Sequence, residues 1–279
     1  MTEPALPIVL LPIGTDDAAL DACLAALEQG TPAGTRVWLL DDAQAGPRGI
    51  AIIERWLDYT QLQAEYSRRP RPIGEAAHLA EGIYACGDLD VAVLAPDVRP
   101  APGWLGQLVT CMQRDATIGT ATPWSNAGEC VAWPRMGEVQ PEPPERRRIA
   151  FAAARMAPLH HELPTAGTHA VMLRGTPRHR IGRLDGESFE SWSAALTDYS
   201  LRLSAMGWRN ALCENAFVAR DREPWRGDDD IEVLAARWPG YRPRLAKFLM
   251  DDPLHDTRLE LQRLYNEAAG ESPQEDLFA

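Results

Sequence analysis

Short apolar runs alternate with segments of helical periodicity over residues 7–122. The apolar runs occupy residues 8–13, 36–40, 62–66, 91–94 and 118–122, and the helical segments occupy 16–29, 50–57, 74–85 and 103–114. In the first helical segment Leu20 and Leu27 fall on one face, and either Thr15 or Asp16 is a suitable N-cap. A chain that repeats strand, helix and strand in this way is expected to form an α/β fold with a mostly parallel central sheet and helices on both faces.

The second half of the chain has a different pattern. Residues 123–148 contain many prolines, which predicts a long loop. Further elements are a strand over 168–174, a helix over 193–206, short strands over 209–212 and 216–219, and two or three amphipathic helices over 229–268. We therefore expect one α/β domain over residues 1–228, followed by a helical extension with an acidic polar tail over 229–279.

Charge and lysine content exclude several classes of protein. The chain has 40 acidic and 28 basic residues, a formal net charge of −12, which argues against a nucleic-acid binder held by an overall positive field. Any anionic ligand must therefore be bound by local groups. Lys247 is the only lysine and lies in neither a glycine-rich phosphate loop nor a cofactor motif. The sequence thus excludes P-loop nucleotide hydrolases and pyridoxal enzymes, which both require a particular lysine.

Cysteine spacing and the N-terminal segment indicate the cellular compartment in which the protein is expected. The five cysteines lie far apart and form no CxxC motif, which predicts reduced thiols. The segment MTEPALPIVLLPIG has an acid where a signal peptide carries a base, and its short apolar run predicts a strand. No run approaches the roughly 20 apolar residues that span a bilayer. We expect a cytoplasmic protein with at most peripheral contact at the inner face of the membrane.

The ends of the predicted strands locate a ligand site before any family is considered. Open parallel sheets bind ligands at the carboxyl ends of their strands. In this chain those ends are residues 12–16, Asp41 with Asp42, and residues 95–98.

Six segments, in order, match the motifs of one known family. IVLLPIG resembles its opening strand VVIPVYN, WLLDDAQ resembles VIDDAS, and VAVLAPDVRPAPGWLGQL resembles VLLNSDTEVPPGWL. ATPWSNAGECVAWP resembles TPLSNNATICSYP, and AALTDYSLRLSAMGWRNALCENAFVARD resembles EENDWCLRAxxxGWRxxLxxxxFVYH. The segment WPGYRPRLAKFLMDDPL resembles the YPxY and DPL ending. Over about residues 7–254 the chain therefore resembles a GT-A fold, family 2 glycosyltransferase of the bacterial surface-polysaccharide type.

This resemblance implies an enzyme and its substrates. It implies a nucleotide-binding half over about residues 7–122 and an acceptor-side half over about 123–228. The expected reaction is inverting transfer of a sugar from a UDP-, GDP- or dTDP-linked donor to a hydroxyl of a glycan, a lipid-linked glycan or a protein. The donor is expected to contact eight residues: Pro12, Ile13, Gly14, Thr15, Asp42, His78, Asp97 and Arg220.

Two of these predicted donor-site residues could instead have a purely structural role. Asp42, at the end of its strand, is placed to accept hydrogen bonds from a base or ribose, and the alternative is an aspartate that holds a turn or helix start. His78 stands where the family often has asparagine, facing the nucleotide, although a single histidine on a helix is more often structural.

Asp97 and Arg220 stand where the family holds a divalent metal ion. The family's DxD triplet is here Ala95, Pro96 and Asp97, so one carboxylate remains. Mg²⁺ or Mn²⁺ would then be held mainly by the donor diphosphate, with Asp97 as a weak ligand, and the alternative is a turn that ends the strand. Arg220 replaces the family's late histidine, and arginine binds phosphate oxygens rather than cations.

These replacements leave two hypotheses open. One is a metal-independent transferase in which Arg220, alone or with Arg222, neutralises the leaving diphosphate. The other is a catalytically silent relative that binds a nucleotide, a glycan or a partner enzyme.

The acceptor side is assigned by the same resemblance. Asp198 matches the family's catalytic base, although the acid that precedes it in the family is absent, and it is also a plausible helix cap. Trp192 and Glu190 fall in the acceptor loop, where aromatic rings stack on sugars, with core packing as the alternative for the tryptophan.

Two further clusters have simpler interpretations. A zinc site made by His160, His161 and His169 is disfavoured, because HELPT is not HExxH and its proline would break the helix that motif needs. The arginine run at 146–148 favours a solvated helix start over steering towards a phospholipid-linked acceptor.

Overall fold

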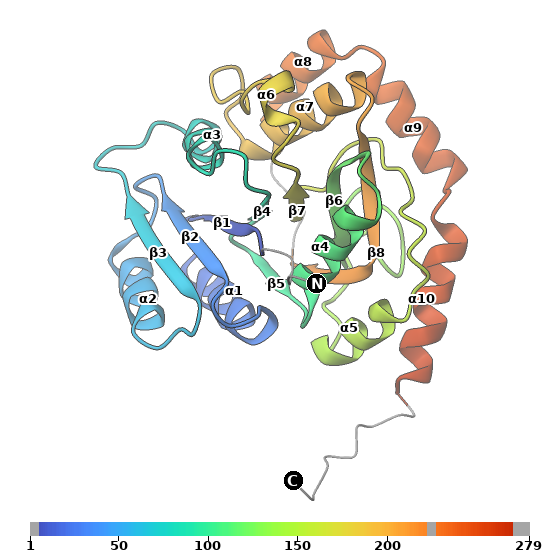
Figure 1. Cartoon of the computed structure of the whole chain (residues 1–279), viewed down its shortest axis with the longest axis horizontal. Helices are drawn as coiled ribbons and strands as arrows, with labels where there is room; N and C mark the ends of the chain where they lie inside the picture. The colour runs from blue at the N-terminus through green and yellow to red at the C-terminus, as the bar shows by residue number, and fades with distance from the viewer. Residues whose placement is uncertain (1–5, 222–226, 270–279) are drawn as a thin grey trace, which may run out of the picture.

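The computed structural model describes residues 6–221 and 227–269 and has one eight-stranded sheet (Figure 1). The strands are β1 (Ile8–Pro12), β2 (Arg36–Asp41), β3 (Gln63–Arg68), β4 (Val91–Leu94), β5 (Val98–Pro100), β6 (Ile118–Trp124), β7 (Ala170–Leu173) and β8 (Arg209–Arg220). The helices are α1 (Asp17–Gly30), α2 (Pro47–Leu57), α3 (Glu75–Ala85), α4 (Trp104–Arg114), α5 (Arg146–Ala154), α6 (Arg178–Ile181), α7 (Trp192–Ala205), α8 (Asp228–Arg237), α9 (Tyr241–Asp251) and α10 (His255–Glu267). The strand order is β3-β2-β1-β4-β7-β6-β8-β5.

The first half of the sheet follows the pattern of the sequence. Strands β3, β2, β1 and β4 are parallel neighbours. Asp16 caps α1 by accepting a hydrogen bond from the backbone N–H of Ala19 at 3.0 Å, and Pro47 begins α2, where its fixed φ suits the first helical turn. Every residue of β4 is buried, as expected for a strand covered on both faces. The predicted α/β fold is confirmed.

The second half contains antiparallel pairs that the sequence did not indicate. Strand β7 is antiparallel to both β4 and β6, and β5 is antiparallel to β8. The two short strands expected over 209–212 and 216–219 are one strand, β8, because the polar residues between them form an irregularity in its pairing with β6 rather than a turn. Helix α5 begins at Arg146, so the arginine run is a helix start.

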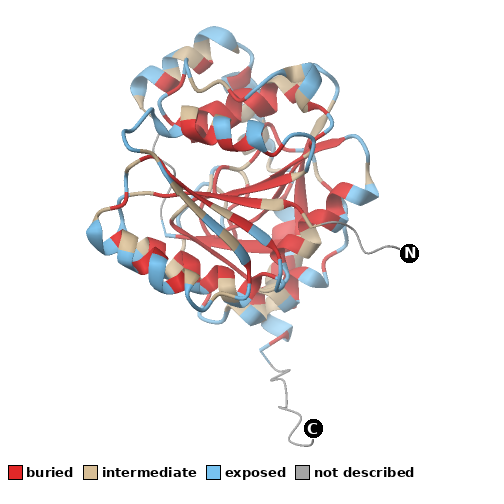
Figure 2. Cartoon of the chain, turned by 60° about the vertical axis from the view of Figure 1, so that its left-hand side comes forward, coloured by how far each residue is buried: buried red, intermediate tan, exposed pale blue. Residues whose placement is uncertain are grey.

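Apolar side chains are buried in two clusters. Figure 2 shows buried strands between exposed-faced helices above and below the sheet. The larger cluster joins the strands to α1, α2, α3, α4 and α7, and the smaller one joins Trp133 and Phe217 to Leu261 of α10. The predicted C-terminal helices are thus α8, α9 and α10, and the polar tail from residue 270 lies outside the described residues. Among the helices described, none combines the length and apolar character that crossing a bilayer requires.

Candidate functional site

The carboxyl ends of β1, β2 and β4 meet at one edge of the sheet. β1 lies between the other two strands, and the N–H of Ile13 donates to the carbonyl of Leu40 at 2.8 Å. Gly14 lies so close to Pro96 that a Cβ atom built on it would stand 3.3 Å from the proline ring. The structure therefore brings residues 12–15 beside residues 95–97, as the strand-end rule predicts.

The carboxylate of Asp42 is already engaged by backbone groups. It accepts hydrogen bonds from the N–H of Ile73 at 2.9 Å and of Gly74 at 2.8 Å, and only 3% of the residue is exposed. These bonds fix the loop that leads into α3. In this arrangement Asp42 holds a helix start, which is the alternative the sequence left open, and contact with a base or ribose stays a prediction.

Asp41 and His78 complete this side of the edge. Asp41 accepts hydrogen bonds from the hydroxyl of Tyr66 and from Arg68, both at 2.6 Å, so it joins β2 to β3. His78 is buried on α3, and burial lowers its pKa below the usual value while nearby Asp42 partly opposes the shift. The ring is therefore neutral near pH 7 and lies beside the predicted nucleotide site.

Asp97 and Arg220 form a buried ion pair. The Nε atom of Arg220 lies 3.0 Å from Oδ2 of Asp97, and each residue is 6% exposed. The pairing of Val98 with Arg220 between β5 and β8 produces this contact, because it places the ends of these strands side by side. The Nη1 atom of Arg220 is buried and makes no hydrogen bond within the described part of the chain. Arg222, the second expected cation, lies outside the described residues.

Asn126 holds the backbone of Arg220 in place. Its Oδ1 accepts a hydrogen bond from the N–H of Arg220 at 2.8 Å, and its Nδ2 donates to the carbonyl of Arg220 at 2.7 Å. The same Nδ2 donates to the carbonyl of Gln140 at 2.6 Å. Asn126 therefore bonds both backbone groups of Arg220 at the end of β8. These bonds fix the position of the Arg220 backbone from which the guanidinium extends.

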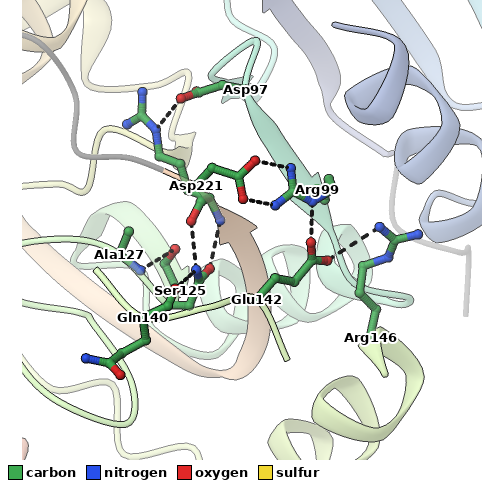
Figure 3. A network of polar contacts seen from close by, with 10 residues as sticks. Asp97, Arg99, Ser125, Ala127, Gln140, Glu142, Arg146 and Asp221 are labelled. Carbon is green, nitrogen blue, oxygen red and sulfur yellow. Dashed lines mark hydrogen bonds and ion pairs between the residues drawn. The ribbon is translucent and has the colours of Figure 1, made fainter. Parts of the chain in front are cut away.

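A second arginine organises the neighbouring loop. Figure 3 shows Arg99 between Asp221 and Glu142, with Arg146 beyond Glu142. The Nη1 atom of Arg99 lies 2.8 Å from Oδ2 of Asp221, and these hydrogen bonds raise the pKa of Arg99 above its usual value. The network ties the residue after Arg220 to β5 and to the loop that precedes α5.

A cavity of about 430 Å³ opens beside Arg220. Its wall consists of residues 127–131, Gly137, residues 165–169 and Arg220. His169 is buried there, and burial together with the positive charge of Arg220 lowers its pKa to about 3. The neutral ring donates from Nε2 to the carbonyl of Pro123 at 3.2 Å. Glu129 is exposed and supplies the only carboxylate among the described lining residues.

Comparison with solved structures identifies the architecture. GalNAc-T7 with UDP, GalNAc and Mn²⁺ superposes with a TM-score of 0.62 at 14% identity over 96% of this chain and 58% of that chain. Mannosyltransferase PcManGT from Pyrobaculum calidifontis, with GDP-Man and Mn²⁺, has a TM-score of 0.55 at 13% identity, and the match covers 96% of this chain and 87% of that chain. Residues 1–349 of S. aureus TarS with UDP-GlcNAc have a TM-score of 0.58 at 10% identity, and the match covers 95% of this chain and 79% of that chain. The chain has the GT-A fold.

Sequence comparison adds no closer relative. No family model matches the chain, and no curated protein matches it. The chain spans little more than half of the GalNAc-T7 structure. The similarity therefore establishes the GT-A fold and leaves the activity to be argued from the site.

The residues predicted to bind a metal do not fit a divalent cation. Asp97 is paired with the guanidinium of Arg220 at 3.0 Å, and this positive charge opposes a second one beside the carboxylate. No group of three His, Cys, Asp or Glu side chains placed to bind a metal occurs within residues 6–221 and 227–269. Of the three histidines considered for zinc, His161 instead pairs with Glu214 at 2.9 Å, and His169 bonds the carbonyl of Pro123.

Asp198 does not line the cavity beside Arg220. It lies in the middle of α7, is fully buried, and accepts hydrogen bonds from Arg202 at 2.8 Å, Arg237 at 3.1 Å and Trp238 at 2.9 Å. Ser191 caps α7, so Asp198 is not a helix cap either. Its role as catalytic base stays a prediction, and it requires these donors to move away.

The predicted acceptor residues lie at the start of α7. Trp192 is 6% exposed and belongs to the larger apolar cluster, which is the core-packing alternative. Glu190 is exposed, and its backbone N–H donates to Asp230 at 2.8 Å. Neither residue lines the cavity beside Arg220.

The structure adds residues to the site that sequence reasoning did not assign. These are Asn126, which positions Arg220, and Glu129 and His169, which line the cavity. The first two lie in ATPWSNAGECVAWP, a segment already matched to the family, so the motif carried a signal for them. For His169 no such signal exists, because its relation to Arg220 arises only from the pairing of the strands.

Proposed function

We propose that this protein is a glycosyltransferase that moves a sugar from a nucleotide-sugar donor to an acceptor hydroxyl with inversion. The GT-A structures named above contain UDP with GalNAc, GDP-Man and UDP-GlcNAc. In this chain the donor would lie over residues 12–15, His78 and Asp97. The acceptor would be a glycan, a lipid-linked glycan or a protein.

The buried guanidinium of Arg220 carries the proposal. It lies at the end of β8, beside the residues that follow β4, and it lines the cavity with its Nη1 atom uncommitted within the described residues. A departing diphosphate gains negative charge, and a fixed guanidinium stabilises that charge most where water is excluded. Asn126 and Asp97 hold the group before substrate binds, so little reorganisation is needed at that step.

The same pair supports a metal-independent reaction. Two of the similar structures contain Mn²⁺, a property of those proteins. In this chain Arg220 is paired with Asp97, so the positive charge that neutralises the diphosphate would come from the protein. Donor affinity should then be unchanged when manganese is replaced by a chelator.

Two carboxylates are candidates for the catalytic base. Asp198 is the residue matched by the sequence, but Arg202, Arg237 and Trp238 hold it. Glu129 already faces the cavity. Turnover lost in Glu129→Gln with donor binding preserved would assign the base to Glu129, and the same pattern in a folded Asp198→Asn variant would assign it to Asp198.

The second candidate function is a silent relative that binds a nucleotide, a glycan or a partner enzyme. The observation that favours it is the immobilised Asp198, because Arg202 and Arg237 hold its carboxylate and the residue does not line the cavity beside Arg220. Donor binding without hydrolysis or transfer, unaffected by either carboxylate variant, would support this candidate.

Calorimetric titration of Arg220 variants tests the main proposal. UDP-, GDP- and dTDP-sugars are titrated with manganese or with chelator, and slow donor hydrolysis is followed in parallel. Arg220→Gln should weaken donor binding by about 10- to 100-fold, since a hydrogen bond between charged groups contributes roughly 1.5–3 kcal/mol. Arg220→Lys should recover part of this loss, and Arg135→Gln, an exposed arginine, serves as the control. Absence of nucleotide binding by the unaltered protein would reject the proposal.

A further inference from the structure

A second cavity, of about 130 Å³, lies between the C-terminal end of α3 and the α6–α7 region. Its wall includes Ile83 and Tyr84 of α3, Arg178 of α6, Tyr199 of α7, and Leu184 from the loop between α6 and α7. Figure 1 shows α3 and the α6–α7 pair at the same end of the molecule, and α3 contacts α7. Because an 11-residue helix is roughly 16 Å long, this cavity is well separated from the Asp42 end of α3.

Three buried hydrogen-bond donors around this cavity have no acceptor among the described residues. They are the hydroxyl of Tyr199 and the Nε and Nη2 atoms of Arg178, none of which bonds another residue that the structure describes. Tyr199 is only 1% exposed. The Nη1 atom of Arg178 donates to the carbonyl of Ile83 at 2.9 Å, which fixes the guanidinium at the cavity wall. A buried donor without an acceptor costs about 1–3 kcal/mol, so three at one cavity indicate an acceptor that is not part of the described chain.

The charges around the cavity specify the sign of that acceptor. The guanidinium of Arg183 lies over the ring of Tyr84, with Cζ 3.4 Å from the ring centre. Asp88 is the only carboxylate among the described lining residues, and it is paired with His179. Burial raises the pKa of Tyr199 to about 12, with Arg178 close enough to oppose the rise, so the hydroxyl remains a donor at neutral pH. Protonated donors and excess positive charge select an anion.

We propose that this cavity binds a small organic carboxylate and is a site independent of the proposed sugar-nucleotide site. The Nε and Nη2 atoms form one edge of the Arg178 guanidinium, which matches the two oxygens of a carboxylate, and Tyr199 donates to one of them. The apolar wall made by Ala80, Ile83 and Leu184 accommodates a short hydrocarbon tail. The cavity volume limits the ligand to a few carbon atoms.

Titration with acetate, butyrate, benzoate and inorganic phosphate tests the proposal. Binding to the full chain is measured by calorimetry and by thermal shift at constant ionic strength set with chloride. Butyrate should bind saturably with a dissociation constant of about 1 mM or below, and more tightly than acetate, because each buried methylene adds to affinity. Benzoate, which has seven carbon atoms, tests the size limit and should bind more weakly than butyrate. Phosphate binding as tightly as butyrate, or no saturable binding at all, would overturn the assignment.

Matched variants locate the bound anion. Tyr199→Phe removes one hydroxyl and should weaken butyrate binding about tenfold, and Arg178→Gln should abolish it. Arg180→Gln, an exposed neighbour in α6, should leave it unchanged, as should Arg220→Gln, which alters the other cavity. If Arg178→Gln does not fold because its contact with Ile83 is lost, Tyr199→Phe alone decides, and unaltered affinity in that variant contradicts the proposal.

Discussion

Individual side chains in this protein act by holding backbone or charge in place, and Asn126 is the strongest case. Asn126→Ala removes the groups that bond the N–H and carbonyl of Arg220 and the carbonyl of Gln140. We expect the free energy of unfolding in urea to fall by about 2–4 kcal/mol, because buried backbone groups lose their partners. Donor affinity should fall with it, since Arg220 is no longer positioned. A loss of stability below 1 kcal/mol would contradict the contacts described.

His169 makes stability depend on pH. Its pKa is lowered from the ordinary value of 6.5 to about 3, so the unfolded chain binds a proton at this residue in a range where the folded protein does not. Stability conferred by the neutral ring is therefore present above about pH 6.5 and lost as the pH falls towards 3, by up to about 1.4 kcal/mol per unit.

The His169→Gln variant isolates this contribution. It should show a flatter dependence of unfolding free energy on pH between about 6 and 4 than the unaltered protein. The exposed His255, changed to glutamine, provides the control. An unchanged slope in His169→Gln would mean that the residue titrates normally in the folded state.

At the scale of elements, Asp198 joins α7 to α8. Its carboxylate bonds Arg202 of the same helix, and Arg237 and Trp238 at the end of α8. Asp198→Asn removes the buried charge that Arg202 and Arg237 share, while Arg237 keeps its ion pair with Asp185, so we expect a loss of about 1–3 kcal/mol in the free energy of unfolding. Thermal and urea unfolding measure it. A base with no structural role would instead lose turnover at unchanged stability.

The elements themselves were predictable to different extents. The strands and helices of residues 7–122 follow from local apolar spacing and from caps such as Asp16, which act within a few residues. Strand β5 has only three residues and one proline, and it exists because β8 offers it an edge. The direction of β7 likewise depends on its neighbours β4 and β6, which local spacing does not report.

At the scale of the whole molecule, the C-terminal helices share a core with the sheet. Leu261 of α10 is fully buried in the cluster that contains Trp133 and Phe217. Leu261→Ala should therefore cost about 2–5 kcal/mol and shift the entire unfolding transition rather than one phase of it. Circular dichroism and tryptophan fluorescence should report coincident transitions. Leu259→Ala, at an exposed position of the same helix, should change little.

The amino-acid sequence was sufficient to predict the α/β fold and which residues meet at the carboxyl edge of the sheet, because apolar periodicity and strand ends are local properties. It also pointed to Asp97 and Arg220 separately. Only the folded chain shows that they form one buried pair across 123 positions, since the pairing of β5 with β8 is non-local. The same holds for Asp198, whose orientation depends on Arg237 and Trp238, two residues that pack against it from another helix.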